Sequence, residues 1–165
     1  MNGAHFHLLV NHLPIVFPIV GVIVMITGLI FKSDAVKRVA YLIFVMAAIA
    51  AIAAMASGDE AEEVAEKISG VSENYIKIHE EAADIFAVLA YILGGISLVG
   101  LWASIKQKSF AMMINLGALV FAFIVIFFSM KTGRTGGEIR HTEIRNGNVT
   151  IPASEHKSTK KDDDD

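Results

Sequence analysis

Residues 8–31 read LLVNHLPIVFPIVGVIVMITGLIF, a run of 24 residues without Asp, Glu, Lys or Arg. An α-helix rises about 1.5 Å per residue, so about 20 apolar residues are enough to cross the hydrocarbon core of a bilayer. Nothing basic precedes the run, and it is long for the apolar region of a signal peptide. We therefore interpret it as a membrane-spanning helix, kinked near Pro14 and Pro18.

Three further apolar runs follow, at about residues 39–57, 82–105 and 110–130. Hydrophobic residues make up 54% of the 165-residue chain and are concentrated in these blocks. The pattern predicts an all-α membrane protein, a four-transmembrane-helix bundle over residues 1–145 in contact with the lipid bilayer. The chain has no cysteine, which excludes disulfides, thiolate metal sites and covalent c-type haem attachment. No basic patch with interleaved aromatic residues indicates a nucleic-acid partner.

The charges between the runs predict an orientation. The two short connections are basic and hold one acid, Asp34; their cations are Lys32, Lys37, Arg38, Lys106 and Lys108. The positive-inside rule places both connections in the cytoplasm. The N-terminus, the loop at residues 58–81 and the C-terminus then lie outside, and the protein is expected in a bacterial inner membrane with both termini in the periplasm.

The polar segments predict a small periplasmic cap. Residues 59–68 form a short acidic helix, and a helix that begins after Ser72 continues through His79 into the third span. The glycine-rich tail does not favour a helix. Asn146-Gly147 between two alternating segments indicates a short β-hairpin. The stretch 146–165 is expected to hold the hairpin end and a disordered polar tail, and its final KKDDDD resembles part of an epitope tag.

Histidines gather at the expected outer face. Five of the six fall there: His5, His7, His12, His79 and His141. Moving a polar group from water into an apolar environment without a hydrogen-bond partner costs roughly several kcal/mol. Such a cluster therefore indicates a ligated cofactor. Helix rise places His5 and His7 near the level of His79 and His12 about 10 Å deeper, which allows one or two cofactors.

Haem b is the favoured cofactor. A porphyrin fits between the helices of a bundle and needs one or two axial imidazoles. The predicted ligands are His7, His12, His79 and His141, with His5 as a substitute. Arg134 and Arg140 would hold the propionates. The protein is then an electron carrier or a respiratory-complex subunit between quinone and a periplasmic cytochrome or respiratory partner.

Two alternatives stay open at this stage. Glu80 and Glu138 lie near the same histidines, so His7, His12, His79 and His141 with these carboxylates favour a Zn or Fe ion, for transport or metal-dependent chemistry. A structural membrane subunit without a cofactor is the other. No catalytic nucleophile or nucleotide motif is present, so no catalytic residue is assigned and enzyme status is left open.

The motifs resemble a bacterial membrane family catalogued as domain of unknown function 2231. Its opening pattern matches residues 7–15, HLLVNHLPI; its later patterns match His79-Glu80-Glu81, Gly136-Gly137-Glu138 and His141. The resemblance covers the chain to about Arg145. It departs at Leu8, where the family usually has proline, and at Ile139-Arg140. It implies a four-helix membrane domain often found near respiratory or cytochrome-containing proteins, with no established reaction.

Overall fold

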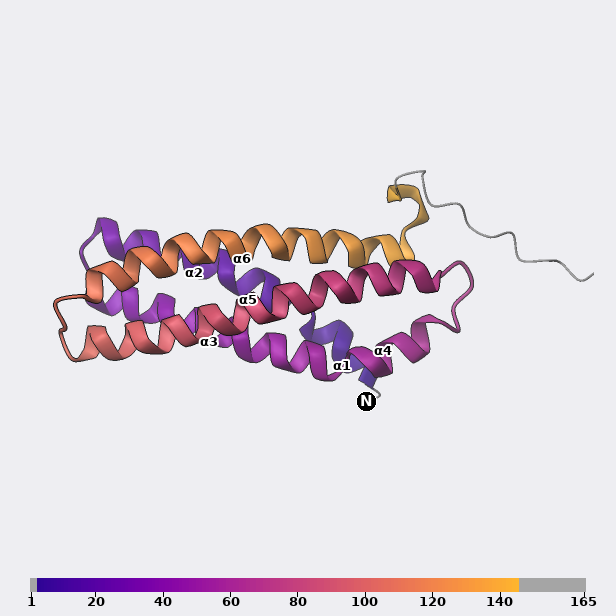
Figure 1. Cartoon of the computed structure of the whole chain (residues 1–165), viewed down its shortest axis with the longest axis horizontal. Coiled ribbons are helices and arrows are strands. Elements are labelled where there is room, and N and C mark those ends of the chain that lie inside the picture. The colour runs from indigo at the N-terminus through magenta and orange to yellow at the C-terminus, as the bar shows by residue number, and fades with distance from the viewer. Residues whose placement is uncertain (1–2, 146–165) are drawn as a thin grey trace, which may run out of the picture.

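The computed structural model describes residues 3–145, and every regular element within them is a helix. Its elements are α1 (Gly3–Val10), α2 (Leu13–Ile30), α3 (Asp34–Ala56), α4 (Gly58–Ala65), α5 (Glu73–Ile105), α6 (Ala111–Arg140) and a short 3₁₀ helix, η1 (Thr142–Ile144) (Figure 1). Four helical segments are long and apolar enough to cross a membrane: Gly3–Ile30, Asp34–Ala56, Glu73–Ile105 and Ala111–Arg140. The predicted all-α architecture with four such helices is confirmed.

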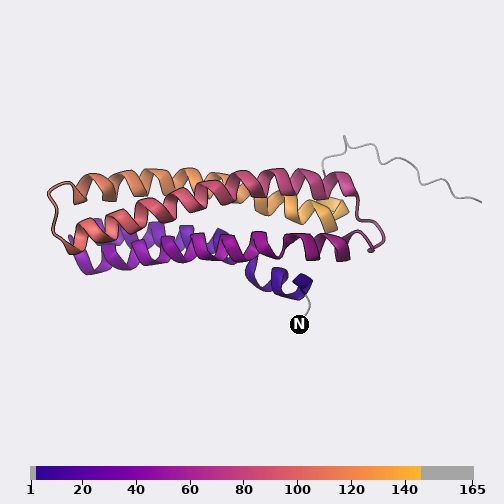
Figure 2. The same cartoon turned by 60° about the horizontal axis from the view of Figure 1, so that its bottom comes forward.

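The bundle consists of two helical hairpins, α2 with α3 and α5 with α6, packed side by side (Figure 2). Tyr41, Phe44, Met25 and Leu93 are completely buried in its core. Large apolar side chains also cover the outside, and among them are Ile23, Leu42, Val88, Leu98 and Phe127. Such an apolar exterior is unusual for a surface in water and suits contact with lipid.

Small residues allow the helices to approach closely. A Cβ atom at Gly21 would lie 2.4 Å from the Phe44 ring, and one at Gly94 would lie 2.6 Å from the Cβ of Ala48. Packing of this kind holds membrane helices together, because lipid supplies no hydrophobic force between them. The glycines of α2 and α5 thus position α3 between these two helices.

The first apolar run is broken rather than only kinked. The helix stops between Val10 and Leu13, at Asn11 and His12. Pro14 explains the position, because proline has no N–H to donate to the Val10 carbonyl and its ring clashes with that carbonyl. The short helix α1 therefore leaves the line of α2 and packs on α4 and the end of α3 (Figure 2).

Both short connections have the same turn and lie at one end of the bundle, here called the basic end (residues 31–38 and 106–110) (Figure 1). α2 ends with a Ser33 N–H to Gly28 carbonyl bond of 2.9 Å, and α5 ends with a Lys108 N–H to Ala103 carbonyl bond of 2.9 Å. These bonds define Schellman motifs. Their left-handed positions are occupied by Lys32 (φ 52°) and Gln107 (φ 48°) instead of glycine.

Gln107→Gly is expected to stabilise the protein. A non-glycine residue in the left-handed region costs about 1–2 kcal/mol. Glycine removes this strain, but its greater freedom in the unfolded chain offsets about half of the gain. A net stabilisation of up to about 1 kcal/mol therefore remains. Thermal unfolding in detergent would measure it, with Gln107→Ala as the control that keeps the strain. A lower unfolding temperature for the glycine variant than for the alanine variant would contradict this expectation.

The predicted β-hairpin is wrong over the described part of its first strand. α6 continues through Gly133, Gly136 and Gly137 to Arg140, and residues 3–145 contain no strand. Gly136 packs against His79, where a Cβ would lie 3.0 Å from the ring, so close packing offsets the low helix propensity of glycine. Arg145 closes the helix by donating to the Glu138 and Ile139 carbonyls at 2.7 and 2.8 Å. The turn at 146–147 and the second strand lie outside the described residues.

The predicted small periplasmic cap is not supported by residues 3–145. The short acidic helix is present as α4, but it packs on α1 and follows directly from α3. The bundle itself forms most of this end, because α5 begins at Glu73 and runs without a break into its apolar part (Figure 1). This end, formed by α1, α4, the start of α5 and the end of α6, is called the histidine end below.

Candidate functional site

The histidine end holds two predicted ligands that are partly buried. His7 lies on α1 and His79 lies on α5, and the charge of His7 acts on His79. The other three predicted histidines are exposed. His5 lies on α1, His12 lies at the break before α2, and His141 follows the last residue of α6.

The ring of His7 is oriented by the end of α3. Its Nδ1 lies 3.0 Å from the Ala54 carbonyl oxygen and 3.2 Å from the Ser57 hydroxyl. A carbonyl oxygen can only accept, so Nδ1 carries the proton and donates it. The Ser57 hydroxyl donates to the Ala53 carbonyl at 2.9 Å and can accept from the ring as well. In the neutral ring Nε2 is therefore left with its lone pair.

The ring of His79 is oriented in the same way by α6. Its Nδ1 lies 3.1 Å from Thr135 Oγ1. That hydroxyl donates its own hydrogen to the Thr132 carbonyl at 3.0 Å, so it acts as an acceptor toward the ring. Nδ1 of His79 therefore carries the proton, and Nε2 again keeps its lone pair.

The end of α6 packs closely against the ring of His79. Gly136 lies against the ring, and buried Thr132 donates to the Ala82 carbonyl of α5 at 3.0 Å. These contacts fix the end of α6 against α5 at the level of the ring. The two imidazoles thus each have a defined tautomer and orientation, as metal-ligating histidines usually do.

One polar atom beside the pair has no described partner. The Oδ1 atom of Asn11 is buried and accepts no hydrogen bond in the described part of the chain. Asn11 follows His7 by one helical turn, and its backbone N–H donates to the His7 carbonyl at 2.9 Å. Buried polar atoms of this kind are normally satisfied by water or by a ligand. A water molecule or a ligand at this position would satisfy the Asn11 oxygen.

The two arginines predicted to hold the haem propionates are not part of the histidine pair. Arg134 is exposed and donates to Glu138 Oε1 at 3.0 Å, one turn along α6, and Arg140 is exposed at the end of the helix. A cation that the sequence did not single out, Arg145, has a structural role. Its guanidinium lies 4.3 Å from the centre of the Tyr75 ring and donates to the Gly70 carbonyl at 3.2 Å, which ties the end of α6 to the start of α5.

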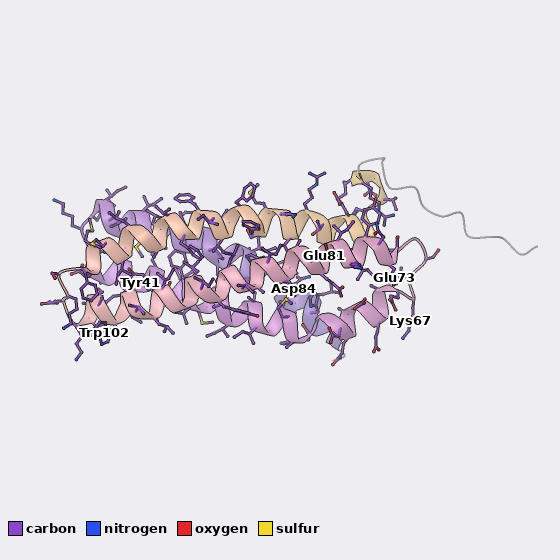
Figure 3. All side chains as sticks on the ribbon, in the orientation of Figure 1. Tyr41, Lys67, Glu73, Glu81, Asp84 and Trp102 are labelled. Carbon is purple, nitrogen blue, oxygen red and sulfur yellow. The ribbon has the colours of Figure 1, made fainter. Side chains whose placement is uncertain are left out.

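The acidic side chains do not complete a metal site in the described residues. Glu80 hydrogen-bonds to Glu62 of α4, and this contact raises the pKa of Glu62. Glu138 is paired with Arg134, and the carboxylate of Glu143 is paired with His141 at 2.8 Å. Figure 3 shows Glu73, Glu81 and Asp84 spread along the half of α5 nearest the histidine end. Within residues 3–145, no three His, Asp or Glu side chains form a group that could hold a metal ion.

Comparison with known proteins gives no match to a family model, to a curated protein or to a solved structure. The resemblance to domain of unknown function 2231 therefore stays a prediction that rests on its short motifs.

Proposed function

We propose that this protein is a b-type haem-binding membrane protein in which His7 and His79 would hold the haem iron. The proposal rests on the tautomer that the two imidazole rings share. Each donates Nδ1–H to an oxygen of a neighbouring helix, at 3.0 Å for His7 and 3.1 Å for His79. Each consequently offers the Nε2 lone pair that haem iron binds.

The ligand count favours haem over the predicted Zn or Fe ion. A structural zinc site has four protein ligands and a catalytic one usually has three. Haem iron needs only one or two axial side chains, since the porphyrin supplies the remaining four. Two imidazoles at one end of an apolar helical bundle therefore suit haem. The pair accounts for one haem per chain.

When bound, haem would supply one-electron transfer. The protein's own residues would set the conditions for it. The Ala54 carbonyl and the Thr135 hydroxyl hold the protons on the two Nδ1 atoms, which fixes the ring planes and increases the basicity of Nε2. The apolar side chains of the bundle exclude water and lower the local dielectric, and both conditions influence a haem potential.

The charge distribution supports an orientation and a role. By the positive-inside rule we place the basic end in the cytoplasm of a bacterial inner membrane and the histidine end at the periplasm. Electrons would then pass between quinone in the bilayer and a periplasmic cytochrome or a respiratory complex. Arg134 and Arg140 lie on the same end of α6 and remain the predicted partners of the propionates.

A reduced-minus-oxidised visible spectrum of the detergent-purified protein tests the proposal. Sharp b-type bands and about one haem per chain by pyridine haemochrome are expected, because one ligand pair is present. A colourless protein from cells with ample haem would contradict the proposal. Metal analysis of the same sample would then distinguish the metal-binding alternative from a cofactor-free subunit.

Thr135→Val is expected to weaken haem binding by about 10–100-fold, the range found for residues that orient a ligating histidine. Valine keeps the shape of threonine but removes the acceptor for His79 Nδ1. Titration of the haem-free protein with haem would measure the affinity. Thr135→Ser restores the hydroxyl and should restore binding. Equal affinities for the valine and serine variants would show that the hydrogen bond is not needed.

A further inference from the structure

A cavity of about 310 Å³ lies at the basic end, away from the histidine pair. It is formed where α3 begins, α5 ends and α6 begins. Its polar lining includes Asp34, Lys37, Ser104, Gln107, Lys108 and Asn115. The volume is at the lower end of the range of ligand sites in proteins.

The cavity carries an excess of positive charge. Lys37 is held there by Asp34, at 2.7 Å, and the lysine side chain is only 13% exposed whereas the aspartate side chain is 61% exposed. Lys108 adds a second ammonium group, positioned 5.6 Å from the centre of the Trp102 ring. Two cations therefore oppose one carboxylate, and that carboxylate faces mainly solvent.

Asn115 adds a donor from the buried side. This residue is 3% exposed, and its Oδ1 accepts from the Tyr41 hydroxyl at 2.8 Å. Its Nδ2 contacts the Met112 sulfur at 3.9 Å, and a thioether is a weak acceptor. The side-chain amide thus keeps donor capacity at the cavity wall.

Two helix N-termini meet at the same place. The first turns of α3 and α6 both line the cavity. Ser33 caps α3 by accepting from the Val36 N–H at 3.4 Å, whereas Phe110 provides no side-chain cap for α6. Each helix N-terminus carries a partial positive charge equivalent to roughly half an elementary charge. Backbone dipoles and side chains therefore favour the same ligand, an anion with several acceptor oxygens.

We propose that this cavity binds a phosphate group, supplied either by the headgroup of an anionic phospholipid or by free phosphate. Its place between helix ends fits the lipid source, because Trp102 and Phe110, with ring centres 6.5 Å apart, mark the membrane boundary at this end. Basic pockets between membrane helices commonly hold anionic lipid headgroups. The proposal does not depend on haem binding.

The test compares three probes on the full-length protein in detergent: phosphatidylglycerol, phosphatidylcholine and inorganic phosphate. Native mass spectrometry counts bound lipid, and thermal unfolding gives the apparent affinity of each probe. Saturable stabilisation by phosphatidylglycerol, absent with phosphatidylcholine, is expected. Stabilisation by inorganic phosphate alone would identify free phosphate as the ligand. If none of the probes stabilises the protein, the proposal is overturned.

Lys108→Gln with Lys106→Gln as its matched control separates the cavity from general surface charge. Both changes remove one positive charge from the basic end, but Lys106 does not line the cavity. Lys108→Gln is expected to weaken binding about fivefold, corresponding to about 1 kcal/mol for one lysine near anionic lipid. Lys106→Gln should have a smaller effect. Equal losses in the two variants would overturn the cavity as the site.

Discussion

If haem binds as proposed, the His79→Ala variant is expected to purify without b-type haem bands. The change removes one of the two Nε2 lone pairs and leaves the Thr135 hydroxyl without its donor. Loss of a direct ligand should exceed the 10–100-fold reduction that follows loss of an orienting residue, so the affinity should fall more than about 100-fold. The reduced-minus-oxidised spectrum and a haem titration would measure the loss.

His141→Ala is the matched control for this prediction. His141 was also a predicted ligand, but its ring is exposed and paired with Glu143 at 2.8 Å. We expect its spectrum to be unchanged. Far-UV circular dichroism should show the same helix content in both variants. Retention of haem by the His79 variant, or an equal loss in both, would contradict the assignment of the His7–His79 pair.

The Gly100→Ala variant is expected to lose about 3 kcal/mol of stability or more, the upper end of the range for overpacked cores. A Cβ at this position would lie 2.2 Å from Cζ of Tyr41. Tyr41 is completely buried and donates its hydroxyl hydrogen to Asn115, so it cannot move without breaking that bond. Thermal unfolding in detergent would show a markedly lower unfolding temperature.

Gly95→Ala, on the same helix, provides the comparison. No atom lies within 4 Å of a Cβ built at Gly95, and the residue is exposed. Alanine should then be neutral or stabilising by up to about 1 kcal/mol, because its helix propensity is higher. If the two variants have the same stability, close approach at Gly100 is not what holds α3 against α5.

The main features of the fold could be predicted from the sequence because they depend on local patterns. Four apolar runs near the length of a membrane span correspond to the four long helical segments. Ser72 was expected to start a helix that continues through His79, and α5 does so. In each case the information lies within one continuous stretch of the chain.

The errors arise where distant contacts override local preference. Gly133, Gly136 and Gly137 are poor helix formers, yet α6 includes them because Gly136 must fit beside His79. The break at Asn11 and His12 was expected only as a kink. The position of α1 after this break depends on its packing against α3 and α4.

The sequence could supply candidate histidines for a site but not their surroundings. The sequence indicated His7 and His79 among five histidines and gave no reason to prefer this pair. The preference comes from Ala54, 47 residues from His7, and Thr135, 56 residues from His79. A serine or threonine near the end of an apolar run has no distinguishing pattern, so these orienting groups appear only when the helices are placed together.

The separation of α1 from α2 has a thermodynamic consequence. α1 is joined to the spanning helices through Asn11 and His12 and is seated on α3 and α4. A group bound to both His7 and His79 would link α1 to α5. Binding of that group and the docking of α1 would then be linked equilibria, and a ligand at 1,000 times its Kd would stabilise the docked position by about 4 kcal/mol. Protection of the chain near Asn11 and His12 from proteolysis would therefore report whether the group is bound.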